Sequence, residues 1–235
     1  MIKLIDMKKI IIAILSLCLG AEVSAQQDDA FKELQKIRAY YDGPELKHIA
    51  GQMLLTNKTN SKAIDKVDFE YWIKDKSVFT KMNYVEIFCN DKVYIMVNHQ
   101  QKSIYARAAG NQKRSTGMFD ASQFQQLLNA KGVKTGITKS AAGNQLKISG
   151  LSGSNFSDFT ITYDPADNKL RSISANVINA DPEDKDQLVL TVTYTKNEKS
   201  TVTTIPAVLS SDKYGTMGKD GVFHFNNNYQ AYTKL

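Results

Sequence analysis

Cysteine is almost absent from this chain, which has 2 in 235 residues, and proline is scarce at 4. Cys18 lies in an apolar run near the start, so Cys89 is the one cysteine of the chain beyond that run. A single cysteine cannot form an internal disulfide, so the fold must be held together by packing. We interpret Cys89 as a buried thiol on a strand, because Val85 and Ile87 share its face.

Long apolar runs are missing as well, apart from residues 10–19, which are too few to span a bilayer. Two lysines precede this run, and a stretch of small residues that ends at Ala25 follows it. A basic start, a short apolar middle and small residues at the end are typical of a cleaved signal peptide. The sequence therefore predicts a signal peptide at 1–25, a single mature domain at 26–235, and export to the periplasm.

Clusters of like charge are also lacking, although the formal net charge is +6 and the pI is about 9.1. Basic residues are scattered among acidic ones, and Lys113-Arg114 is the one adjacent basic pair after the leader. Nucleic-acid interfaces usually gather basic residues with aromatic residues between them, so we expect no nucleic-acid partner. The modest positive excess suits a solvated surface and leaves peripheral contact with anionic lipid headgroups open.

Catalytic and metal-binding motifs are incomplete. Ser210 to Lys213 matches S-x-x-K and Lys134 to Gly136 matches K-T-G, but their order is reversed and the third element of such enzymes is missing. The 3 histidines are far apart in the sequence. We therefore expect no enzyme, no metal and no cofactor. The acidic loop Asp181 to Asp186 leaves cation binding open, with a solvated hairpin tip as the favoured interpretation.

What the chain does have is strand-like alternation interrupted by two helical patterns. A cap of two aspartates and an apolar stripe of Phe31, Leu34 and Ile37 predict an amphipathic helix. A second helix is predicted from Asp120 to Gly132. The remaining segments predict roughly nine to eleven antiparallel strands with short connections, which indicates an α+β fold.

The expected hairpin around Asn90 is apolar on both faces. Ile87 and Phe88 point to opposite faces of its first strand, and Ile95 and Met96 to opposite faces of its second. We expect the turn at Asn90-Asp91 because asparagine and aspartate tolerate the positive φ of tight hairpin turns. A sheet that is apolar on both faces must be covered on both, by a helix, a loop, a partner or a ligand.

The segment Glu86 to Val97, the strand that begins at Lys102, and Phe159 to Asp164 after a helix together carry a resemblance to a known family. In their order and periodicity they resemble the periplasmic lipoprotein-carrier (LolA-like) superfamily. The resemblance implies an unclosed (half) β-barrel of mainly antiparallel strands, covered by two or three short helices. It also implies a hollow that carries lipoprotein acyl chains.

The function that the resemblance implies is a non-enzymatic carrier or binding protein that holds a lipid or lipoprotein acyl chain in an apolar cavity. One alternative is an accessory subunit of a cell-envelope or secretion assembly, in which the same fold binds envelope proteins. A hydrolase with a dispersed site is a further alternative. The strand faces with the stronger apolar alternation supply the expected cavity lining: Phe69, Tyr71, Ile87, Ile95, Phe159, Ile161, Leu190 and Val192.

Overall fold

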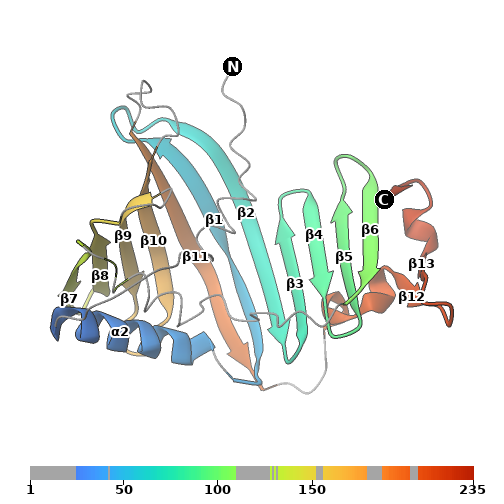
Figure 1. Ribbon diagram of the computed structural model, residues 1–235, viewed down its shortest axis with the longest axis horizontal. Coiled ribbons are helices and arrows are strands. Elements are labelled where there is room, and N and C mark those ends of the chain that lie inside the picture. Colours follow the sequence, from blue (N-terminus) through green and yellow to red (C-terminus); the bar gives the residue numbers. More distant parts are fainter. Residues whose placement is uncertain are drawn as a thin grey trace. The chain divides into compact units, whose positions relative to one another are not determined.

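The computed structural model describes residues 25–41, 43–109, 128, 130, 132–151, 156–178, 187–201 and 206–235. Within these residues the chain has one α-helix, α2 (Ala25–Tyr41), and is otherwise mostly β-strand (Figure 1). This differs from the two or three helices that we expected. The second predicted helix, which starts at Asp120, lies almost entirely outside the described residues; of its apolar stripe only Leu128 is described, and it is helical and buried.

The strands follow the predicted alternation closely. Three short 3-10 helices lie near the C-terminal end: η1 (Ala207–Leu209), η2 (Ser211–Lys213) and η3 (Asn227–Tyr229). The strands are β1 (Leu46–Asn57), β2 (Ala63–Lys74), β3 (Ser77–Met82), β4 (Val85–Cys89), β5 (Val93–Asn98), β6 (Ser103–Ala108), β7 (Lys134–Thr138), β8 (Asn144–Ser149), β9 (Phe156–Tyr163), β10 (Leu170–Val177), β11 (Leu188–Ser200), β12 (Gly215–Met217), β13 (Phe223–Phe225) and β14 (Thr233–Lys234).

Twelve of these strands form one unclosed sheet, in the hydrogen-bonded order β14-β6-β5-β4-β3-β2-β1-β11-β10-β9-β8-β7. Strands β12 and β13 form a separate two-stranded sheet. Neighbouring strands from β2 to β6 and from β7 to β11 run antiparallel, whereas β14 runs parallel to β6. The expected class of mainly antiparallel strands in an unclosed sheet is confirmed, and the half-barrel stays a prediction.

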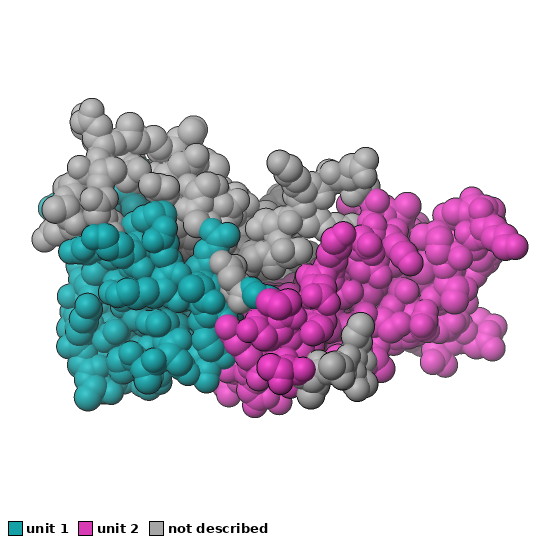
Figure 2. All heavy atoms as spheres, turned by 90° about the horizontal axis from the view of Figure 1, so that it is seen from below, with its two compact units in different colours: residues 1–43, 53–66, 117–194 teal, residues 44–52, 67–116, 195–235 magenta. Residues whose placement is uncertain are grey.

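The chain divides into two compact units (Figure 2). Unit 1 consists of residues 1–43, 53–66 and 117–194, and unit 2 of residues 44–52, 67–116 and 195–235. Strands β1, β2 and β11 contribute residues to both units, and each unit has a core of its own.

In unit 1, α2 buries one stripe of its surface. Ala30, Leu34 and Ile37 are buried, whereas Phe31, which we expected in the stripe, is only half-buried. The spacing of four and then three residues still follows one face of a helix, so the stripe is displaced by one position at its start.

Two hydrogen bonds from α2 reach the sheet of unit 1. The Tyr163 hydroxyl of β9 donates to Oε2 of Glu33 at 2.6 Å, and the Leu170 N–H of β10 donates to the Tyr41 hydroxyl at 3.1 Å. Because Tyr163 shares its strand face with Phe159 and Ile161, these bonds show which face of the sheet α2 covers.

In unit 2, the turn between β4 and β5 forms where we expected it but by another device. The Asn90 N–H donates to the Val93 carbonyl at 3.0 Å, and the Asn90 side-chain oxygen accepts from the N–H groups of Lys92 and Val93 at 2.9 and 2.8 Å. Asn90 does not have a positive φ. An asparagine side chain that imitates a backbone acceptor closes the turn without the left-handed conformation that we predicted.

The C-terminal segment of residues 206–235 covers one face of the β3–β6 sheet, which we call the packed face. Phe88, Val93, Ile95, Val97 and Ile104 supply its buried sheet residues. They form one hydrophobic core with Tyr214, Phe223 and Tyr229 of the segment. A second, smaller cluster joins Phe79 of β3 to Leu209 of η1.

Candidate functional site: the aromatic face of unit 2

The other face of strands β2–β6 is rich in aromatic and methionine side chains, and we call it the aromatic face. Cross-strand partners share a face of a sheet, so the register of the strands identifies the residues of this face. One row runs Tyr71, Thr80, Ile87, Met96, Tyr105. The flanking rows are Phe69, Met82, Val85, Asn98, Ser103 and Ile73, Val78, Cys89, Tyr94, Arg107.

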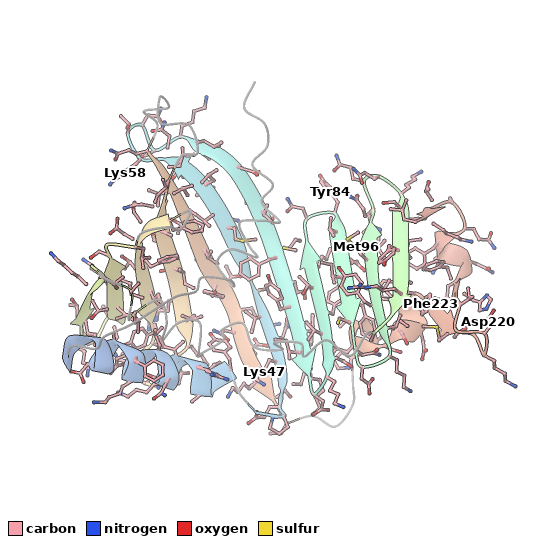
Figure 3. All side chains as sticks on the ribbon, viewed as in Figure 1. Lys47, Lys58, Tyr84, Met96, Asp220 and Phe223 are labelled. Atoms are coloured by element: carbon pink, nitrogen blue, oxygen red, sulfur yellow. The ribbon has the colours of Figure 1, made fainter. Side chains whose placement is uncertain are left out.

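Burial separates the two faces clearly. On the packed face the apolar residues of β5 are almost completely buried, whereas on the aromatic face Tyr94 and Met96 of the same strand are half-buried. Figure 3 labels Met96 on β5. A contiguous layer of large, incompletely buried apolar side chains marks an interaction surface more often than a structural one.

Two tyrosines of the aromatic face have a raised pKa, which favours their neutral form. Burial raises the pKa of Tyr71 to about 12. Burial, together with the nearby Cys89, also raises the pKa of Tyr94. The aromatic rings lie close to one another, with centroids 5.4 Å apart for Phe69 and Tyr71 and 6.4 Å apart for Tyr94 and Tyr105.

One cation lies at the β6 side of this face. The Arg107 guanidinium is 5.3 Å from the centroid of the Tyr94 ring, a distance at which the cation is attracted to the ring. Arg107 is exposed, so its charge remains in contact with water. The aromatic face therefore combines an uncharged apolar layer with a positive margin, which suits an apolar chain that ends in a polar or anionic group.

The structure divides the eight expected lining residues into three groups. Phe69, Tyr71 and Ile87 lie on the aromatic face. Ile95 lies on the packed face, because Ile87 pairs with Met96 and Phe88 pairs with Ile95. Ile95 is therefore part of the core beneath the C-terminal segment, not part of the surface that holds Ile87.

The remaining four expected residues come together in unit 1. Ile173 of β10 pairs with Ile161 on one side and with Val192 on the other. Ala175 pairs in the same way with Phe159 and Leu190. Phe159, Ile161, Leu190 and Val192 thus share one face, the face that α2 covers, and all four are buried.

Sequence reasoning missed several members of the aromatic face, among them Met82, Tyr94, Met96 and Tyr105. The signal was present as a period of two, but only cross-strand register decides which residues of neighbouring strands share a face. A list drawn from the most apolar positions favoured isoleucine over tyrosine and methionine, and it therefore combined residues from both faces.

Two of the histidines that the structure describes are paired with carboxylates inside the protein. His48 Nε2 is 2.7 Å from Glu70 Oε1 and stacks on Trp72, and His99 Nε2 is 3.3 Å from Glu86 Oε1. In the expected S-x-x-K match, the Ser210 hydroxyl accepts from the N–H of Asp212, and Lys213 pairs with Glu86 at 2.6 Å.

No group of three or more His, Cys, Asp or Glu side chains among the described residues could hold a metal ion. The acidic loop Asp181 to Asp186, for which cation binding was left open, lies outside those residues. Among the helices that the structure describes, none combines the length and the apolar character needed to cross a membrane.

No family model and no curated protein matches this sequence. Similar solved structures include a LolA superfamily protein of Nitrosomonas europaea, which is 7% identical, with 81% of this chain and 100% of that chain covered and a TM-score of 0.32. They also include an uncharacterized conserved protein of Thermus thermophilus, at 8% identity, 77% and 96% coverage and a TM-score of 0.44. The MucA/MucB complex of Pseudomonas aeruginosa is similar at 12% identity, 79% and 62% coverage and a TM-score of 0.43.

A LolA superfamily protein is therefore among the solved structures that are similar to this chain. Identities of 7 to 12% and TM-scores of 0.32 to 0.44 say nothing about what this chain binds. The function has to be argued from the chain's own surfaces.

Proposed function

We propose that this chain is an exported, non-enzymatic binding protein of the periplasm that holds the acyl chain of a lipid or lipoprotein. The observation that carries this proposal is the aromatic face, a layer of half-buried aromatic, methionine and isoleucine side chains on unit 2. Water solvates such a layer poorly, so covering it with an acyl chain is favourable. Methionine side chains such as Met82 and Met96 adapt to the irregular shape of a flexible chain.

The eight expected lining residues have different roles in this proposal. Phe69, Tyr71 and Ile87 belong to the aromatic face; the half-buried Tyr71 and Ile87 would contact the ligand directly, whereas Phe69 is buried. The four buried residues of unit 1 form an apolar layer under α2, which would accept an acyl chain only if the residues around it moved. Ile95 has no part in the proposal, because the C-terminal segment already buries it.

The non-enzymatic part of the proposal is supported by the partners of the polar groups. Glu86, Glu33 and His48 are each engaged in hydrogen bonds or ion pairs inside the protein. A general base or nucleophile needs a free face toward a substrate, and the aromatic face presents neutral hydroxyls instead.

The direct test is native mass spectrometry of protein purified gently from the periplasm of an expression host. We expect a bound mass that corresponds to a phospholipid or fatty acid and that organic solvent removes. Delipidated protein should then take up a fluorescent fatty acid. Protein that is always free of ligand and takes up no fatty acid would overturn the proposal.

A double variant tests whether the ligand binds to the aromatic face. Ile87→Thr combined with Met96→Gln keeps a β-branched residue at position 87 and a side chain of similar length at position 96, but makes the centre of the aromatic face polar. We expect fatty-acid affinity to fall about tenfold, the equivalent of about 1.4 kcal/mol of lost apolar contact. Ile64→Thr is the matched control, because Ile64 is already exposed at the start of β2.

The same variants test the alternative of an accessory envelope or secretion subunit. In that case the purified protein would hold no lipid, and crosslinking in intact cells would produce one stable high-mass product. Loss of that product in the Ile87→Thr, Met96→Gln protein, but not in the Ile64→Thr protein, would assign the aromatic face to a protein interface.

A further inference from the structure

Strand β6 has an edge that the chain covers only in part. Short β14 pairs with it in parallel over Ser103 and Ile104, and the Leu235 N–H donates to the Ile104 carbonyl at 3.0 Å. Backbone groups of alternate residues point to the same side of a strand. Ala106 and Ala108 therefore direct their N–H and C=O groups toward the same edge as Ile104, beyond the end of β14.

The hydrogen bonds of β6 follow this alternation of backbone groups. Ala109 donates to the carbonyl of Lys92 at 2.8 Å, so odd-numbered residues here bond toward β5. Among the strands that the structure describes, β14 alone pairs with the outer edge of β6. Ala108 is exposed, so this edge is open to solvent.

A cavity of about 530 Å³ lies beside this open edge, within unit 2. Ala106, Arg107 and Ala108 line one side of it, and the β12–β13 hairpin lines the other. Its lining includes two exposed apolar side chains, Met217 and Val222, which are 38% and 54% exposed. Figure 3 labels Phe223 next to the sheet and Asp220 at the outer end of the hairpin turn.

The charged lining of the cavity is positive. Arg107 and Lys234 line it, and no residue of its described lining has an acidic side chain, although the carboxylate of the last residue, Leu235, is part of the lining and offsets one of the two cations. The nearest acid of the hairpin turn, Asp220, lies outside the lining and is 3.8 Å from His224 Nε2. An occupant with negative charge is therefore favoured over one with positive charge.

We propose that the edge site, formed by Ala106–Ala108 of β6, the β12–β13 hairpin and Lys234, binds an extended acidic segment of a partner protein. The segment adds a strand to β6 where β14 ends, and its backbone pairs with Ala106 and Ala108. Its apolar side chains contact Met217 and Val222, and its acidic side chains face Arg107 and Lys234. This inference shares Arg107 with the aromatic face but does not require that an acyl chain binds there.

The probe is a capped, fluorescent hexapeptide of alternating glutamate and valine, with an alternating lysine and valine peptide as the charge-reversed control. Fluorescence anisotropy at low salt measures binding to the full chain. We expect the acidic peptide to bind at least about tenfold more tightly than the basic one, because the site is positive. Hydrogen exchange at Ala106 and Ala108 should slow when the acidic peptide is bound.

Two variants and a control locate the binding. Val222→Asp and Lys234→Glu should each weaken binding of the acidic peptide by about tenfold. Ile178→Asp, at an exposed position on unit 1, should leave it unchanged. The proposal is overturned if both peptides bind equally or neither binds, or if the edge variants bind the acidic peptide as tightly as the unaltered chain. It is also overturned if these variants instead abolish binding to anionic lipid vesicles, which would make the site a lipid contact.

Discussion

The buried carboxylate of Glu86 links β4 to the C-terminal segment within unit 2. It is 7% exposed, and it accepts hydrogen bonds from Lys213 at 2.6 Å and from the Tyr214 hydroxyl at 3.0 Å. Glu86→Gln removes the negative charge from this site, and we expect it to lower the free energy of unfolding by about 2 kcal/mol. Urea denaturation at pH 7 measures the loss. Glu198→Gln, on an exposed side chain, is the control and should change the midpoint little.

The same carboxylate predicts a pH dependence. Burial alone would raise the pKa of Glu86, but hydrogen bonds from Lys213 and Tyr214 and the charge of Lys213 outweigh it and hold the pKa below its usual 4.5. A lowered pKa in the folded state contributes stability above pH 4.5 that is lost as the pH falls through the folded value. The stability gap between the unaltered chain and Glu86→Gln should therefore narrow below pH 4.5. A gap that stays constant from pH 7 to about pH 3 would contradict this account.

Tyr163 makes a comparable contribution in unit 1. Its hydroxyl donates to Glu33 at 2.6 Å, and burial followed by this bond raises its pKa far above the ordinary value. Tyr163→Phe keeps the ring in the core but removes the donor, so we expect a loss of about 1 to 2 kcal/mol in unfolding free energy. Thermal denaturation followed by circular dichroism would show it. Tyr84→Phe, at an exposed turn, should melt with the unaltered protein.

At the scale of elements, burial of the packed face depends on the C-terminal segment. Tyr214 is fully buried, with its ring 6.0 Å from Phe88 and 5.9 Å from Tyr229. Tyr214→Ala should cost about 3 to 5 kcal/mol and speed hydrogen exchange in β5. Tyr214→Phe separates the ring from its hydroxyl and should cost only the bond to Glu86. If the two substitutions were equally costly, packing of the ring would not be the main contribution.

Alternation in the sequence was enough to find the strands, but not to match their faces. The pairing of Cys89 with Tyr94 places odd-numbered residues of β4 beside even-numbered residues of β5. This offset depends on the turn after Cys89, where an Asn90 side chain sets the geometry. Turn geometry of this kind is not readable from apolar periodicity, which is why Ile87 and Ile95 were predicted to line one surface.

At the scale of the whole molecule, local patterns predicted the class of fold and missed the role of the tail. The strands near the C-terminus are three residues or shorter, and 3-10 helices lie before β12 and between β13 and β14. Such short pieces have too few alternations to show a period. Their contribution comes from contacts distant in sequence, such as Tyr214 against Phe88, which a single sequence does not reveal.

Export concerns the whole chain, and cleavage of the predicted signal peptide after Ala25 can be tested directly. Of the described residues of α2 (Ala25–Tyr41), cleavage after Ala25 would remove only the first, and it would leave the buried stripe of Ala30, Leu34 and Ile37 intact. Protein secreted by a bacterial host should therefore begin at Gln26, as intact mass and N-terminal sequencing would show. Ala25→Lys places a long charged side chain at the position that the peptidase reads, and the leader should remain attached. Gln27→Lys, beyond the cut, should still be processed. Processing of the Ala25→Lys chain at the same bond would show that these residues are not a signal peptide cleavage site.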